Sequence, residues 1–107
     1  MNPGERRARR YYALRGYRLL DVNAWAGGNE LDLVVRRGRT LVFCEVRSRT
    51  RTDYGTALEM VRPEKVRRVR RAAEAWLATH PECAHLEVRL EVVGVYGSRL
   101  ERVRVDA

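Results

Sequence analysis

The sequence predicts a single α/β domain, in which a mixed central sheet is flanked by helices. Its 107 residues are a length typical of one domain. With 45% hydrophobic and 34% charged residues, its composition is that of a globular protein. Segments of helical and strand-like pattern follow in the order helix, three strands, helix, two strands, and no repeat or linker divides residues 1–107.

The first helix is expected to begin at Pro3 and to stop at Gly16. Asn2 is a suitable N-cap, and proline is favoured at the first helical position. Glycine commonly follows the end of a helix. The expected apolar side consists of Ala8, Tyr11, Tyr12 and Leu14, with arginines around the rest.

Three strands are expected next, at residues 17–25, 29–36 and 40–48. Glycines at 27, 28 and 38 mark the turns between them. Cys44 falls in an apolar stretch and is expected to be a small core residue. Trp25 lies beside the first glycine turn and is expected in the core rather than on the surface. Residues 50–61 show no clear period, which indicates a loop.

A second helix is expected from Pro63 to about Thr79, because apolar residues recur there at helical spacing. Its apolar stripe includes Trp76, which we expect in the core, and the arginines at 67, 68, 70 and 71 lie largely off the stripe. Two final strands are expected at residues 86–96 and 100–106, around a turn at Gly97 and Ser98.

The charge balance favours a polyanionic partner. The net charge is +8 and the isoelectric point about 10.5, so nucleic acid is the first candidate and a solubilising surface is the alternative. Lys65 is the only lysine among 22 basic residues, which indicates a general preference for arginine. The sequence shows neither a membrane-length apolar run nor an N-terminal signal-peptide pattern, so we expect a cytoplasmic protein without a membrane partner.

The second and third strands carry acids, which are depleted from strands in general. Pairing their apolar rows requires an even-length turn, and we expect Val35 opposite Thr40, Leu33 opposite Val42 and Glu30 opposite Glu45. Glu30, Asp32, Glu45 and Arg47 would then share one end of one face. The turn end of that face would be covered, and the opposite face would pack on a helix.

Carboxylates gathered in this way can converge on one hard cation. Magnesium takes carboxylate and water ligands, and a bound ion activates water and stabilises charge on a phosphate. Phosphodiester hydrolysis needs those parts. The alternative is that Arg47 and nearby arginines neutralise the acids as ion pairs, and spacing alone leaves the two readings about equal.

Four stretches, taken in order, carry a resemblance to a known family: "GGNELDLVV", "LVFCEVRSR", "YGTALEMV" and "RPEKVRRVRRAAEAWL". They resemble the YraN-like proteins, a bacterial family with a restriction-endonuclease-like fold that is related to Holliday-junction resolvases. The resemblance runs from Gly4 and Glu5 to the strand at 87–95. It implies a restriction-endonuclease-like core for the α-β-β-β-α-β-β order.

The resemblance also implies roles for individual residues. Nucleases of this kind place an aspartate on one strand and Glu-x-Lys on the next, around magnesium or manganese. By position, Asp32 and Glu45 are the metal-binding acids, and Val46 adds a backbone carbonyl. Glu5, from the first helix, and Glu30, just before the aspartate, are further catalytic candidates.

Arg47 departs from this pattern, because lysine stands there in the nucleases. Arginine stays protonated and cannot serve as a base, although it can contact phosphate. Lys65 matches a lysine in the family's helix and is the candidate to compensate, against the alternative of a solvated helix face. The candidates for nucleic-acid contact are Arg47, Ser48, Arg49, Arg51, Tyr54, Lys65 and Arg68; plain solvation, or loop anchoring for Tyr54, is the alternative.

The sequence therefore predicts a metal-dependent DNA endonuclease, acting on branched or damaged DNA, with Arg47 contacting the scissile phosphate. The alternatives are a nucleic-acid-binding module that has lost the chemistry, and a structural or partner-binding protein with ion-paired acids. Resolvase-like proteins often dimerise, so the resemblance also points to a homodimer.

Overall fold

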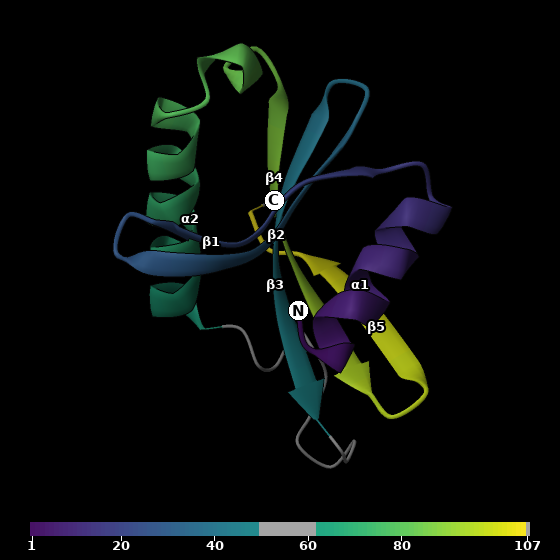
Figure 1. Cartoon of the computed structure of the whole chain (residues 1–107). Helices are drawn as coiled ribbons and strands as arrows, with labels where there is room; N and C mark the ends of the chain where they lie inside the picture. The colour runs from purple at the N-terminus through teal and green to yellow at the C-terminus, as the bar shows by residue number, and fades with distance from the viewer. Residues whose placement is uncertain (50–61, 107) are drawn as a thin grey trace.

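The computed structural model describes residues 1–49 and 62–106, and it confirms the predicted order of elements. One mixed five-stranded sheet in the order β1-β2-β3-β4-β5 has α1 on one face and α2 on the other (Figure 1). The neighbouring strands are antiparallel except β3 and β4, which are parallel. The elements are α1 (Pro3–Leu14), β1 (Arg18–Ala26), β2 (Asn29–Arg37), β3 (Thr40–Arg49), α2 (Pro63–Ala78), the 3₁₀ turn η2 (Pro81–Cys83), β4 (Glu87–Tyr96) and β5 (Arg99–Arg104).

Helix α1 begins with the predicted cap. The Asn2 side chain accepts a hydrogen bond from the Glu5 amide, and the Glu5 side chain accepts one from the Asn2 amide. Two orphan donors at the helix start are thereby satisfied. Ala8 and Tyr12 are buried against the sheet as expected, but Leu14 is 76% exposed, so its assignment to the apolar side was wrong. It is the last residue of the helix, where the chain already turns away towards Gly16.

Helix α2 covers the other face of the sheet. Trp76 is buried there as predicted and packs edge-to-face on Phe43. The four arginines at 67, 68, 70 and 71 are exposed, as their places off the stripe predicted. Cys44 is a buried free thiol, also as predicted. Among the described residues, no helix is both long enough and apolar enough to cross a bilayer.

Trp25 is 75% exposed, so its predicted place in the core was wrong. The reason is strand alternation. Its neighbours Ala24 and Ala26 pack towards the α2 side, which directs Trp25 to the opposite face. Gly27, at the tip of the β1–β2 hairpin, touches the α2 backbone at Arg71 and leaves the tryptophan outside the contact.

The predicted faces of the β2–β3 hairpin are correct for β3 and for β2 from Leu33 onward, but its register was wrong by two residues. Leu33 pairs with Cys44, Val35 with Val42 and Arg37 with Thr40. Gly38 has a φ of +59°, a conformation that favours glycine and allows a tighter turn than expected. Glu30 therefore does not face Glu45.

Glu30 instead faces Trp25 on β1. Leu31 was also placed on the wrong face, because it packs on the α2 side while Leu33 packs on the α1 side. The alternation of side chains thus changes phase on either side of Asp32.

The β2–β3 pairing ends at Leu33 and Cys44. Beyond this point β2 continues beside β1 as far as Asn29, and β3 continues beside β4 as far as Arg49. Figure 1 shows β2 curving away with β1 while β3 runs on. We call this divergence, beyond Leu33 and Cys44, the fork. At the fork, Asp32 no longer pairs with β3 through its backbone.

Candidate active site

Three carboxylates converge at the fork. Oxygens of Glu5, Glu30 and Asp32 all lie within 4.8 Å of one another. Glu5 comes from the first turn of α1, and the other two come from β2. The helix and the diverging strand therefore bring together residues 25 or more positions apart in the chain.

Glu5 is held from two directions. Its Oε1 accepts the Asn2 amide at 3.1 Å as part of the helix cap, and its Oε2 accepts the Asn23 side-chain amide at 3.1 Å. The side chain is 6% exposed, so it has little freedom to move. The capping box thus orients a candidate catalytic residue and also starts the helix.

Asn23 is the residue of this site that sequence reasoning missed. Its Nδ2 donates to Glu5 at 3.1 Å and to Glu30 Oε1 at 3.0 Å, so one amide holds two carboxylates close together. Its φ of +49° lies in the left-handed region, where asparagine is tolerated better than most residues. An asparagine within a strand-like run was the available signal, because asparagine is depleted from strands.

Asp32 lies at the fork. Its Oδ2 accepts the Val46 amide at 2.8 Å and so takes the place of a strand partner for β3. Burial raises the pKa of Asp32 from 3.8 to about 6, and the nearby Glu45, Glu5 and Glu30 add to the rise, while the Val46 amide opposes it. The cluster is thus a place where negative charge is crowded and incompletely neutralised.

Glu45 lies outside the group of three and is paired with cations. Its Oε1 is 3.0 Å from Lys65 Nζ and 3.3 Å from a terminal nitrogen of Arg47. Burial raises the pKa of Glu45, and Arg47 and Arg68 lower it. The structure therefore brings Lys65, on α2, to the same carboxylate as Arg47, on β3.

A shallow pocket of about 170 Å³ lies between Glu30 and the Glu45–Lys65 pair. It is lined by Asn29, Glu30, Glu45, Lys65, Arg68 and Val69. Acids from the strands form one part of its wall and cations from α2 form another. The pocket thus offers carboxylates for a metal beside cations for a phosphate.

The other predicted contact residues lie nearby or outside the described chain. Ser48 is exposed at the end of β3 and lies against Gly4, where an added Cβ would meet its Oγ. Arg49 is the last residue of β3. Arg51 and Tyr54 fall between 50 and 61, outside the described residues.

Comparison with known proteins supplies the family. The model described as "Uncharacterised protein family UPF0102" matches residues 4–95. The chain belongs to the UPF0102 family. A UPF0102 protein from Frankia casuarinae is 46% identical over 96% of this chain and 86% of its own length. UPF0102 proteins from Kineococcus radiotolerans and Vibrio campbellii are 46% and 35% identical, over 86% and 91% of this chain and 75% and 80% of their own lengths.

The residues of this UPF0102 site suit a hard divalent ion. Glu5, Glu30 and Asp32 offer carboxylate oxygens, which are the ligands that magnesium and manganese prefer. Burial, and to a smaller extent the neighbouring carboxylates, raise the pKa of Asp32, and a bound cation would stabilise its charged form. Within residues 1–49 and 62–106, no histidine or cysteine joins this group, which disfavours a zinc site.

Proposed function

We propose that this UPF0102 protein is a metal-dependent endonuclease that hydrolyses phosphodiester bonds in DNA. One observation carries the proposal: the fork gathers three carboxylates within 4.8 Å beside the Lys65–Glu45–Arg47 group. The net charge of +8 supports a polyanionic substrate. Branched or damaged DNA remains the expected substrate, from the resemblance to resolvases.

Magnesium or manganese would be held by Glu5, Glu30 and Asp32. When bound, the ion would stabilise negative charge on the phosphate and make a bound water more acidic. The resemblance assigned the metal to Asp32, Glu45 and the Val46 carbonyl, and that set stays a prediction. The described contacts favour Glu5 and Glu30 as partners of Asp32, because the Glu45 carboxylate is already paired with two cations.

Lys65 would take the part that lysine plays on the strand of related nucleases. Its ammonium lies 3.0 Å from Glu45 and has further N–H groups that could donate hydrogen bonds to a phosphate oxygen. Arg47 would contact the same phosphate but cannot accept a proton. Both cations would stabilise charge as the bond to the leaving oxygen breaks.

A second candidate function is a nucleic-acid-binding module without chemistry. The observation in its favour is that the acids have partners within the protein: Asn23 bridges Glu5 and Glu30, and Lys65 and Arg47 pair with Glu45. Such contacts hold the carboxylates without an ion. In this case DNA would bind at the cations and would not be cut.

A cleavage panel separates the two candidates. Purified protein is incubated with duplex, single-stranded, flapped and four-way DNA, with magnesium, with manganese or with a chelator. We expect divalent-dependent cleavage that Asp32→Asn abolishes without loss of folding. Binding in the chelator together with intact DNA under every metal condition would overturn the nuclease and leave the binding module.

A homodimer also remains a prediction. Sedimentation of the protein alone and with four-way DNA measures it directly. A twofold complex on a four-way substrate is the expected result.

A further inference from the structure

A second polar site lies on the α1 face of the sheet, near the end of α1 away from Glu5. It is a cavity of about 110 Å³, several times the roughly 10–15 Å³ that holds one water. Arg15, Arg37, Arg89 and Arg102 line it, together with three tyrosines and a single acid, Glu91. We call it the Arg–Tyr pocket. Nothing in the proposed chemistry at the fork uses these residues.

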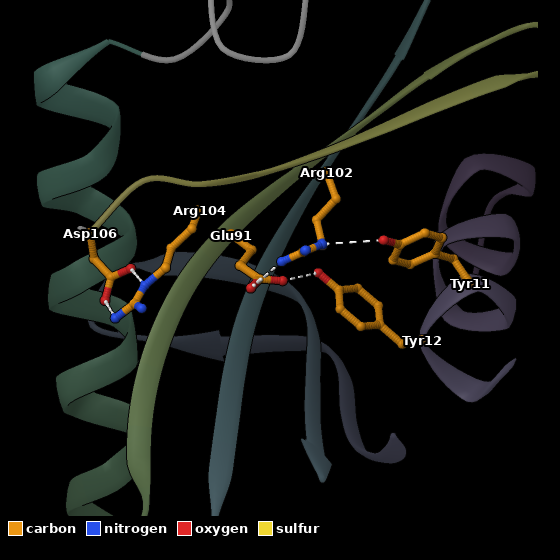
Figure 2. Close-up of polar contacts among 6 residues, drawn as sticks. All are labelled: Tyr11, Tyr12, Glu91, Arg102, Arg104 and Asp106. Carbon is orange, nitrogen blue, oxygen red and sulfur yellow. Dashed lines mark hydrogen bonds and ion pairs between the residues drawn. The ribbon is translucent and has the colours of Figure 1, made fainter. Parts of the chain in front are cut away.

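Glu91 organises one wall of the pocket. It is 1% exposed, and its oxygens accept the Tyr12 hydroxyl at 2.7 Å and an Arg102 terminal nitrogen at 2.9 Å (Figure 2). Arg102 Nε donates in turn to the Tyr11 hydroxyl at 3.2 Å. Burial raises the pKa of Tyr12, so this hydroxyl remains a donor. A buried carboxylate is costly unless it is paired, and Arg102 supplies that pairing.

The remaining arginines make the pocket strongly cationic. The Glu91–Arg102 pair cancels its own charge, so Arg15, Arg37 and Arg89 leave a net charge of +3 among the lining residues. Among the described residues, no acid other than Glu91 lines the cavity to balance this charge. An anionic ligand would balance it.

Two of these guanidinium groups are held in place by aromatic rings. Arg15 lies 3.6 Å from the Tyr11 ring centre, and Arg37 lies 4.6 Å from that of Tyr17. One nitrogen of each donates to a backbone carbonyl, of Tyr11 and of Arg15 respectively. A guanidinium has five N–H donors, so four of each are unused in these contacts between described residues. Such preorganised forks match the oxygens of a phosphate.

The pocket shares part of its lining with a larger depression. Tyr11 and Arg15 also line this depression of about 510 Å³ between α1 and β5, together with Arg6, Arg7, Arg10, Leu14 and Leu100. Single phosphates need no such extension, whereas a polynucleotide has a phosphate at every step. Glu5 and Tyr12 are seven residues apart on α1, about 10 Å along the axis. A strand that follows α1 could therefore reach from the acids at the fork to the pocket.

We propose that the Arg–Tyr pocket binds a second backbone phosphate of the polynucleotide whose scissile phosphate lies at the fork. The inference rests on the proposed function for the identity of the polymer. The pocket would set the position of the strand relative to the acids. Its contribution to binding does not require metal or cleavage.

The test is DNA binding in a chelator, measured by fluorescence anisotropy with a labelled single-stranded oligonucleotide. Arg89→Gln and Arg37→Gln each remove a pocket cation, and Arg39→Gln removes an exposed one from the β2–β3 turn, outside the pocket. Melting temperatures show that the variants are folded. We expect a loss of affinity of about tenfold for each pocket variant and less than twofold for Arg39→Gln. Equal small losses in all three variants would overturn the proposal.

Inorganic phosphate separates the two sources of a phosphate group. We expect phosphate to compete with the oligonucleotide in the wild-type protein and to compete less in Arg89→Gln. If the pocket variants lower the affinity for inorganic phosphate but leave the affinity for the oligonucleotide unchanged, the assignment of a polynucleotide ligand is overturned. This assay measures binding and does not depend on cleavage. Its result therefore tests the pocket independently of the proposed nuclease function.

Discussion

Asp32 joins fold and proposed function in one side chain. Its carboxylate accepts the Val46 amide at 2.8 Å and so closes the backbone hydrogen bonding where β2 and β3 part. It also lies with Glu5 and Glu30, which raise its pKa along with burial. A residue that repels its neighbours persists in a stable fold only when other contacts offset the cost.

Replacing this charge should stabilise the metal-free protein in a pH-dependent way. The pKa of Asp32 is raised from 3.8 to about 6, so the folded state binds its proton more tightly than the unfolded chain does. Its favourable contribution is present below about pH 4 and is lost as the pH rises to about 6. The Asp32→Asn variant keeps an acceptor for the Val46 amide. At pH values above 6, the melting temperature of this variant should exceed that of the wild type by roughly 4 °C.

The same comparison at about pH 4 should show little difference, because the wild-type carboxyl is then largely protonated. Thermal melts across this range, with and without manganese, measure the effect. Added manganese should narrow the gap at neutral pH by stabilising the wild type. A difference that does not change with pH would show that the charge of Asp32 is already neutralised.

Lys65 should matter more than its place on a helix surface suggests. Lys65→Gln removes the ammonium that lies 3.0 Å from Glu45, and cleavage should fall about 100-fold with folding intact. Arg67→Gln removes a cation from the exposed part of the same helix and should change the rate less than twofold. Arg47→Lys should preserve or raise activity. Full cleavage activity in Lys65→Gln would show that Lys65 takes no part in the mechanism.

The types of residue at the site were predictable, but their partners were not. Asp32 and Glu45 stand out in the sequence because they are acids in strand-like segments, and strands rarely carry acids. Asn23 was missed because its backbone conformation and its bridge between two carboxylates depend on tertiary structure. The Glu91 network was missed for the same reason, since Tyr12 lies 79 residues away from it in the chain.

At the scale of elements, the β1–β2 hairpin and α2 position the site together. The hairpin carries Asn23 and Glu30, and α2 carries Lys65. They meet where Gly27 touches the helix backbone. We expect this close approach to help set the position of the hairpin acids relative to the cations of α2.

Gly27→Ala should therefore disturb both stability and activity. A Cβ there would lie 2.9 Å from the Arg71 carbonyl oxygen and 3.2 Å from the Ala72 Cα. Gly28→Ala is the matched control, because Gly28 also has a positive φ but has nothing within 4 Å of an added Cβ. Backbone strain alone should lower the free energy of unfolding of Gly28→Ala by about 1–2 kcal/mol. The free energy of unfolding of Gly27→Ala should fall by about 1–3 kcal/mol more.

Urea denaturation measures the two free energies of unfolding. Cleavage should fall more in Gly27→Ala than in Gly28→Ala under conditions in which both are folded. Equal destabilisation would mean that the helix backbone yields at this contact and that the hairpin is not tightly docked.

The succession of elements was predictable because periodicity and turn residues mark it locally. The hairpin register was not, because a shift by two residues keeps every side chain on its face and satisfies the same pattern. The turn at Gly38 decides between the registers. The fork itself left no local signal, since it arises where two pairs of strands separate.

At the scale of the whole molecule, the excess of positive charge should govern DNA binding. Of the residues that the structure describes, Arg47, Lys65 and Arg68 place cations around the fork, and the proposed pocket adds others. In a chelator, the logarithm of the binding constant should fall with the logarithm of salt concentration with a slope of about −3 or steeper. Arg68→Gln should make that slope shallower by about 1. A flat dependence would favour a partner-binding protein with ion-paired acids.

Calorimetric titration of manganese into the metal-free protein at neutral pH measures whether the carboxylates at the fork hold an ion. If Glu5, Glu30 and Asp32 are its ligands, the wild type should bind manganese and Asp32→Asn should bind it at least about tenfold more weakly. Glu74→Gln, an exposed acid on α2, should bind as the wild type does. Equal affinity in the wild type and Asp32→Asn, or no binding by either, would contradict the account.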